Sequence, residues 1–483
     1  MLFNSFSFFL FLPIVLVLYM ITPKRYRWVL LLVASYYFYM SWNATYALLI
    51  AFSTLVTYAS GIYIYKAKTE KLKKVIVAIS FITNLAILFF YKYFNFFSET
   101  IGKTFDIIGM DVDAPILDLL LPVGISFYTF QALSYTMDVY RNEIKPERHI
   151  GIYALFVSYF PQLVAGPIER SKHLLPQLRD LKNFEYDNLR SGLLLILWGF
   201  FKKIVIADRV AILVNTVYNN PGDYTGIETV WAVLFFSIQI FCDFSAYTDI
   251  ARGVARLMGI DLMNNFNSPY FAKSITEFWR RWHISLSTWF RDYLYIPLGG
   301  SRKGLQRTYW NLFIVFLVSG LWHGASMNFV IWGAMHGIFI VFEKMLNKKK
   351  QNGESTTPTL SNKIFNGLFT FSVVTFLWIF FRADTFNDAI VVVKNLFNWK
   401  YENLFNGSLY NLGLTANEFI WVLVFVVIML LVEYYNSFVK SISKLLVQQH
   451  IVLRWAVYLS FVLIILVFGA YGGEQQEFIY FQF

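Results

Sequence analysis

GLWHGASMNFVIWGAMHG (residues 320–337) is an apolar, glycine-rich stretch that holds two of the six histidines of this chain, His323 and His336. An ionisable side chain in the middle of a bilayer costs about 2.5 kcal/mol or more, so its presence needs an explanation. On one straight helix, the thirteen-residue spacing would put the two rings about 20 Å apart along the axis. Rings so far apart cannot bind one ion unless the helix breaks, and we predict no metal site.

The composition of the whole chain indicates a membrane protein. Of its 483 residues, 57% are hydrophobic and 15% are charged, and the mean hydropathy is +0.51, whereas soluble domains carry about 25% charged residues. Such a chain cannot hide its apolar surface in one aqueous core. We predict a single polytopic, all-α membrane domain over residues 1–483. The net charge of +11 fits basic loops on one side of a membrane, and we exclude nucleic-acid binding.

Hydrophobic runs predict roughly a dozen membrane-embedded helices, because each crossing of about 30 Å needs about 20 residues. The runs lie near residues 5–21, 28–42, 44–65, 75–97, 190–214, 228–248, 308–322, 324–342, 365–381, 417–436 and 452–470. Two further runs, 115–136 and 150–166, contain prolines and glycines. We predict that these two runs are interrupted or re-entrant, with protein covering the freed backbone groups.

Basic loops predict the orientation. Lysines and arginines cluster at 24–27, at 66–74 and in the polar loop 343–363, which places these segments in the cytoplasm and the amino terminus outside. Acidic residues after the fourth run suit the outer side: Glu99, Asp106, Asp111 and Asp113. The first run lacks the basic start and cleavage site of a signal peptide, so we expect a membrane helix there.

Residues 261–306 are too polar for a simple span and too aromatic for a solvated loop. We predict one helix over TEFWRRWHISLSTWFRDYLY, beginning at Ser274 or Thr276, with aromatic side chains at Phe278, Trp282, Trp289 and Tyr293. An interfacial anchor helix is the plain interpretation of this pattern. His283 is harder to explain that way, and the neighbouring arginines favour its neutral form. Cations within or just after this helix are candidate contacts for phosphates: Arg280, Arg281, Arg302 and Lys303.

Two carboxylates, Asp243 and Asp249, lie in an apolar run. Membrane carboxylates are candidates for function, but we favour a structural role in which they bind the arginines of 252, 256 or 280–291. The single cysteine, Cys242, excludes an internal disulfide and a zinc site built from several thiolates. The final segment, GGEQQEFIYFQF, is interpreted as an interfacial aromatic anchor, which we favour slightly. The alternative, which the family resemblance described next implies, is a tail near the mouth of a tunnel or near a partner.

Taken together, FWRRWHISLSTWFRDYLYIPLGG and GLWHGASMNFVIWGAMHG resemble the membrane-bound O-acyltransferase family, most closely its bacterial alginate O-acetyltransferase branch. Further matching stretches cover essentially the whole chain: LPVGISFYTFQALSYTMDVYR, FPQLVAGPIER, QIFCDFSAYTDIARGVARLMGI, WIFFRADTF and FIYFQF. The resemblance implies a ring of membrane helices around a tunnel. It also implies that His323 is the principal catalytic residue and His283 the second polar residue of the tunnel.

The implied reaction is acyl transfer to a hydroxyl, for which imidazole is a suitable base near neutral pH. Acetyl-CoA is the expected donor substrate, no bound cofactor is needed, and His336, Trp282, Trp289, Trp322 and Asn328 are expected along the tunnel. The resemblance implies an exported glycan of the alginate, cellulose or peptidoglycan type, and an esterase-like partner outside the membrane. It also implies a multi-pass location in the bacterial cytoplasmic membrane.

Three alternatives remain open at this stage. The related branch that transfers D-alanine to teichoic acid from a carrier-protein thioester shares the histidine pattern. A transporter of acyl groups or glycans would not need chemistry at these residues, but paired carboxylate relays and inverted half-helices are not evident. A structural scaffold for glycan secretion would have no need of buried histidines. Replacement of His323 by alanine separates the enzyme from both non-enzymatic alternatives.

Overall fold

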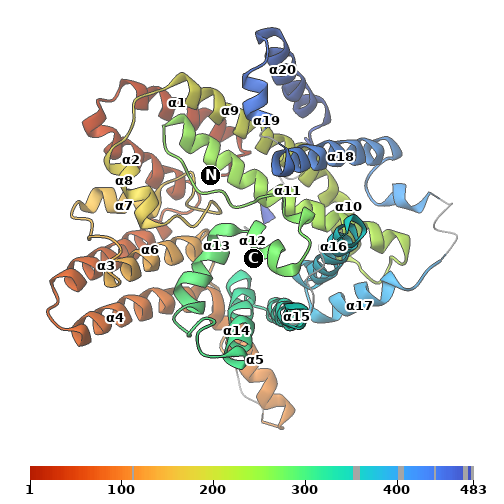
Figure 1. Cartoon of the computed structure of the whole chain (residues 1–483), viewed down its shortest axis with the longest axis horizontal. Helices are drawn as coiled ribbons and strands as arrows, with labels where there is room; N and C mark the ends of the chain where they lie inside the picture. Colours follow the sequence, from red (N-terminus) through yellow and green to blue (C-terminus); the bar gives the residue numbers. More distant parts are fainter. Residues whose placement is uncertain (111–113, 352–358, 401–406, 440–441, 472–476, 480–483) are drawn as a thin grey trace. The chain divides into compact units, whose positions relative to one another are not determined.

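A computed structural model describes residues 1–110, 114–351, 359–400, 407–439, 442–471 and 477–479. Within these ranges every regular element is helical (Figure 1), which confirms the all-α prediction. The chain divides into two compact units, Met1–Ile196 with Ile250–Met263, and Leu197–Asp249 with Asn264–Phe483. The prediction of a single domain stays a prediction. Of the acidic outer segment, Asp111 and Asp113 lie outside the described residues, as does the middle of the basic loop 343–363.

The first unit is built from packed helices, with α3 beside both α4 and α6 (Figure 1). Its helices are α1 (Phe6–Ile21), α2 (Arg27–Met40), α3 (Tyr46–Lys66), α4 (Glu70–Leu88), α5 (Phe94–Ile107), α6 (Ile125–Tyr140), α7 (Ile150–Ser158), α8 (Ser171–Arg179) and most of α9 (Tyr186–Phe200). A π-helical turn, η2 (Phe89–Tyr93), joins α4 to α5 without a break, and a short 3-10 turn, η1 (Lys24–Tyr26), precedes α2.

The second unit contains the histidine-bearing stretch. Its longer helices are α10 (Asp208–Asn219), most of α11 (Ile227–Leu257), α14 (Leu305–His323), α15 (Met327–Gln351), α16 (Leu360–Arg382), α17 (Phe386–Leu396), α18 (Ala416–Phe438) and α20 (Ile451–Phe468). Short elements complete it: η3 (Phe201–Ala207), η4 (Pro269–Phe271), α12 (Ile275–Arg281), α13 (Ile284–Phe290), η5 (Arg291–Tyr295), η7 (Ser408–Asn411) and α19 (Ile442–Val447).

Seven helices of the described residues are long and apolar enough to cross a membrane, and they confirm a polytopic membrane protein. They are Tyr46–Lys66, Glu70–Ile107, Ile227–Leu257, Met327–Asn347, Leu360–Arg382, Ala416–Phe438 and Ile451–Phe468. The eleven hydrophobic runs predicted as continuous coincide largely with helices. The total of roughly a dozen embedded helices, and the tunnel, stay predictions.

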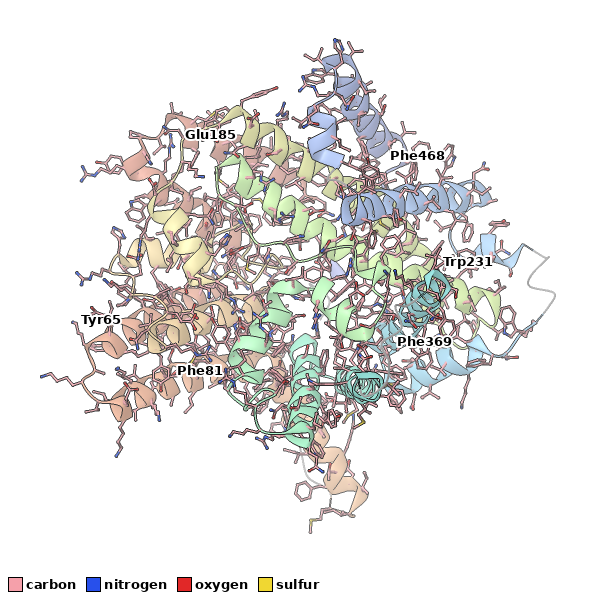
Figure 2. The ribbon with its side chains drawn as sticks, in the orientation of Figure 1. Tyr65, Phe81, Glu185, Trp231, Phe369 and Phe468 are labelled. Carbon is pink, nitrogen blue, oxygen red and sulfur yellow. The ribbon has the colours of Figure 1, made fainter. Side chains whose placement is uncertain are left out.

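The outer faces of these helices are apolar, as contact with lipid requires. α20 has a mean hydropathy of 2.5 and none of its residues is buried. Tyr65, at the end of α3 and labelled in Figure 2, is 57% exposed. A water-soluble protein rarely leaves so much contiguous apolar surface uncovered, so these faces are suited to the hydrocarbon of a bilayer.

The two runs predicted to be interrupted are interrupted. α6 begins only after Gly124, whose φ of 75° is left-handed, and α7 ends at Ser158, ahead of a non-helical segment. Neighbouring side chains bind the freed backbone groups: the Phe160 amide donates to the Ser35 hydroxyl (3.1 Å), and Gln131 donates to the Phe156 carbonyl (2.5 Å). The freed backbone is therefore covered by protein, as membrane burial requires.

Candidate active site

The histidine stretch forms a hairpin of two helices, and all residues of the site described here belong to the second unit. α14 ends at His323, Gly324 is extended (φ −161°, ψ 155°), and α15 begins at Met327. The two helices then lie side by side (Figure 1). A Cβ at Gly333 would lie 3.0 Å from the Cα of Gly320, so only glycine lets the backbones meet this closely.

The hairpin brings both histidines of the stretch against one indole. The ring centre of Trp332 lies 5.1 Å from that of His323 and 4.9 Å from that of His336. The straight-helix geometry considered from the sequence therefore does not hold, because the chain breaks at Gly324. Among the described residues, no group of three or more His, Cys, Asp or Glu side chains could hold a metal ion.

A second break places His283. The predicted continuous helix over this segment is wrong, because α12 ends at Arg281 and α13 begins at Ile284. His283 between them has φ 44° and ψ 55°, a left-handed conformation that costs a residue other than glycine about 1–3 kcal/mol. Asn265 stabilises the break by accepting hydrogen bonds from the amides of Ile284 (3.0 Å) and Ser285 (3.1 Å). The predicted start is correct, since the Ser274 hydroxyl accepts from the Glu277 amide.

His283 and His323 lie beside each other in the protein interior. Their ring centres are 6.4 Å apart at an interplanar angle of 64°, and the residues are 0% and 4% exposed. Trp322 contacts both rings, Phe244 packs on His283 and Phe381 on His323. Burial lowers the pKa of His283 to about 3, which keeps this ring neutral. The direction agrees with the sequence analysis, but the cause is burial rather than the neighbouring arginines.

The tryptophans of the 276–295 segment are buried, so their interpretation as interfacial anchors is wrong. Trp282 is 1% exposed and packs on Trp378 at 5.1 Å, and Trp289 is 6% exposed and packs on Tyr293 at 5.1 Å. Of the residues expected along the tunnel, Trp322 contacts both rings of the histidine pair. Asn328 instead donates to the Ala383 carbonyl (2.7 Å) and ties the start of α15 to the end of α16.

A cavity of about 780 Å³ reaches Ser319, one helical turn before His323 on α14, although neither His283 nor His323 lines it. Its outer part carries exposed or half-buried polar residues, and its inner part is apolar and aromatic. It is lined by Ser274, Thr276, Glu277, Trp279, Arg280, Leu286, Ser287, Phe290, Arg291, Tyr295, Leu312, Val315, Phe316, Ser319, Ile340, Glu343, Lys344 and Asn347. Ser319 lies four residues before His323 on α14, which puts the two side chains on the same helix face one turn apart.

The cations proposed from the sequence are distributed differently around this cavity. Arg280 lines it, whereas Arg281 pairs with Glu277 (2.7 Å) and donates to the Ser437 hydroxyl (3.1 Å). Arg302 and Lys303 are exposed in the turn after η5 and are not part of the lining. The lining cations that the sequence analysis did not propose are Arg291 and Lys344. Lys344 is distant in sequence from Arg280, and Arg291 joins the two through the tertiary structure of the same segment.

Sequence reasoning also missed the aromatic residues that enclose the histidines. Trp332 lies in the quoted stretch itself, and Trp378 and Phe381 lie in WIFFRADTF. Trp332 stacks on Trp378 with ring centres 5.6 Å apart. Aromatic residues are so common in this chain, at 20%, that their pattern alone could not distinguish the site from the rest of the core.

The membrane carboxylates bind lysines. Asp243 pairs with Lys203 (2.7 Å), which also pairs with Asp208 (2.8 Å), and Asp249 accepts from Lys202 (2.7 Å). The predicted arginine partner of Asp243 is therefore wrong. The π-helical turn η3 brings the two consecutive lysines inside, where they are 1% and 0% exposed.

Part of the final segment contacts this ion cluster. The amide of Ile479 donates to Asp243 (2.7 Å), and the ring of Phe478 lies 4.3 Å from the Lys203 ammonium. Phe478 and Ile479 are 1% and 2% exposed, so the interfacial-anchor interpretation is wrong for these two residues. The remainder of the aromatic end, residues 480–483, lies outside the described residues.

A buried imidazole pair one helical turn from a cavity, in a multi-pass helical protein, supplies the proton-transfer groups that a membrane-embedded acyltransferase would need. The sequence model of the MBOAT, membrane-bound O-acyltransferase family, matches residues 148–383. The chain is 40% identical to the probable alginate O-acetylase of Pseudomonas putida over 402 residues, which cover 83% of this chain and 81% of that protein. It therefore belongs to the membrane-bound O-acyltransferase family, in its alginate O-acetyltransferase branch, and is an O-acyltransferase.

The names of other relatives point to different acceptors of the acyl group. The peptidoglycan O-acetyltransferase of Helicobacter pylori is 36% identical over 81% of this chain and 76% of its own length. The teichoic acid D-alanyltransferase of Bacillus subtilis is 31% identical over 48% of this chain and 62% of its own length. The two O-acetyl relatives thus match this chain more fully than the D-alanyl relative does.

Proposed function

We propose that this enzyme takes an acetyl group from cytoplasmic acetyl-CoA and moves it across the membrane for the O-acetylation of an extracytoplasmic polysaccharide of the alginate, peptidoglycan or cellulose type. The observation that carries the proposal is the pair His283 and His323, buried 6.4 Å apart and one helical turn from a cavity lined by Ser319. Similarity to two O-acetyl transferases over more than four fifths of this chain supports an acetyl group over D-alanine.

The cavity is suited to an acyl donor with phosphates. Arg280, Arg291 and Lys344 supply cations at its exposed part, and charge-assisted hydrogen bonds to phosphate are among the strongest that proteins make. Lys344 stands at the start of the basic loop predicted to be cytoplasmic. The apolar inner part suits the pantetheine arm and the acyl group, and Arg281, Arg302 and Lys303 have a lesser role in this proposal.

The two imidazoles divide the chemistry. His323 accepts the proton of the acceptor hydroxyl as its oxygen attacks the acyl carbon. Neutral His283 donates a hydrogen bond to the thioester carbonyl oxygen, where negative charge develops. The carbon–sulfur bond then breaks, and the proton held by His323 passes to the departing thiolate. The products are an O-acyl ester and free CoA, and no bound cofactor takes part.

The location proposed for the enzyme is the bacterial cytoplasmic membrane, with the amino terminus outside. An esterase-like partner outside the membrane would carry the acetyl group onward to the glycan. Trp282, Trp289, Trp322, Asn328 and His336 are proposed to line or support the path between the two sides.

Two measurements test the proposal. Purified enzyme should release CoA from [acetyl-14C]acetyl-CoA, and a His323→Ala variant of equal thermal stability should lose at least 100-fold of that rate, the lower range for a general base. In cells, envelope and secreted glycans should lose acetyl esters when the gene is deleted or carries His323→Ala. Retained glycan acetylation with a correctly inserted His323→Ala protein would overturn the proposal.

A further inference from the structure

One buried histidine is left without a chemical role by the reaction above. His336 is 0% exposed on α15, and its Nδ1 accepts a hydrogen bond from the indole Nε1 of Trp279 on α12 (3.2 Å). A neutral ring that accepts at Nδ1 carries its proton on Nε2. That Nε2 has no hydrogen-bond partner among the described residues. The ring thus leaves one buried donor unsatisfied while it holds Trp279.

Trp279 connects the lining of the cavity to the histidine pair through one further indole, that of Trp332. It lines the cavity, is 6% exposed, and packs on Phe316 (5.2 Å) and Trp332 (5.7 Å). Trp332 in turn contacts His323 at 5.1 Å. The indole is therefore one of the bulky groups at the inner part of the cavity, one aromatic layer away from the proposed base.

The orientation of this indole depends on His336. Without an acceptor at that position, the buried N–H of Trp279 would have to find another partner, because a buried unsatisfied donor is costly. Rotation of the indole to reach one would change the space available inside the cavity. The edge-on contact of the two rings, at an interplanar angle of 84°, holds the indole in its present orientation.

We propose that Trp279 limits the length of the acyl group that the enzyme accepts, and that His336 is a positioning residue that holds Trp279 in the restrictive orientation. This rests on the proposed function, in which the cavity takes the acyl donor. A short acetyl group fits beside the indole and reaches His323, whereas each added methylene of a longer chain must displace aromatic side chains.

The test compares kcat/KM for acetyl-CoA and butyryl-CoA in purified enzyme. Trp279→Ala should reduce the preference for acetyl-CoA by about 10- to 100-fold, since one methylene in a fitted pocket already changes kcat/KM by about 10- to 200-fold. His336→Leu, which cannot accept a hydrogen bond, should relax the preference in the same direction. His336→Asn, whose side-chain oxygen can accept from the indole, should retain most of it.

A double-mutant comparison isolates the hydrogen bond. In a Trp279→Phe background no indole N–H remains, so adding His336→Leu should change the preference less than twofold. If His336 had a purely structural role, its replacement would lower kcat/KM for acetyl-CoA and for butyryl-CoA together. The ratio of the two values would then stay unchanged in every His336 variant, and this result would overturn the inference. If wild-type enzyme uses neither acyl-CoA as donor, the proposed function itself fails, and this outcome is distinct from an unchanged ratio.

Discussion

Gly320 lies at the close backbone contact between α14 and α15. We predict that Gly320→Ala inactivates the enzyme while leaving it folded. The added Cβ would overlap the carbonyl oxygen of Phe329 on α15 and come within 3.1 Å of the Cα of Gly333. Carbon and oxygen need about 3.3 Å at a non-bonded contact, so α14 and α15 must separate by on the order of 1 Å. Overpacking of this size costs about 1–3 kcal/mol, which a folded protein can tolerate.

The catalytic cost should be larger than the stability cost. His323 lies three residues after Gly320 on α14, and a displacement of about 1 Å at a reacting group costs about 100-fold in rate. The assay is CoA release by detergent-purified enzyme, beside a thermal unfolding curve for each variant. Gly337→Ala is the matched control, because its Cβ would meet Phe313 at the milder distances of 3.1–3.4 Å. Wild-type activity in a folded Gly320→Ala protein would refute the reasoning.

Two further predictions concern buried charge. Burial depresses the pKa of His283 to about 3 in the folded protein, whereas a histidine in the unfolded chain has a pKa of about 6.5. As the pH falls below about 6.5, the unfolded chain is therefore protonated at this position first. The free energy of unfolding should drop by about 2 kcal/mol at pH 5. Thermal unfolding in detergent at pH 7.5 and pH 5 measures this, and His283→Gln should lack that increment. Lys203→Met leaves Asp208 and Asp243 without their cation and should destabilise by about 3–5 kcal/mol. Replacing the 59% exposed side chain of Lys172 by methionine should change the unfolding temperature little.

The glycines of the hairpin explain how the buried histidines can be placed so closely in an apolar interior. Gly320 and Gly333 let two helix backbones touch, and Gly324 ends α14 at the histidine that it carries. The left-handed conformation of His283 serves the same purpose on the other side of the pair. In each case a local departure from regular helix turns an imidazole toward its neighbour.

The sequence by itself determined the broad outcome. Hydropathy and charge settle that the chain is a helical membrane protein, because long apolar runs have no other stable environment. Motif resemblance was enough to identify the family and to single out His283 and His323. The breaks in the runs 115–136 and 150–166 were also visible, since proline and glycine disrupt helices through local backbone geometry.

Only the tertiary structure decided which buried groups face one another. The break at His283, the pairing of Asp243 with Lys203 and the grouping of Arg280 with Arg291 and Lys344 depend on contacts between segments far apart in the chain or on a backbone conformation stabilised by Asn265. Periodicity reports the face of one helix and carries no information about its neighbours. The hydrogen bond from Trp279 to His336 has the same origin, because helix packing alone brings those two rings together.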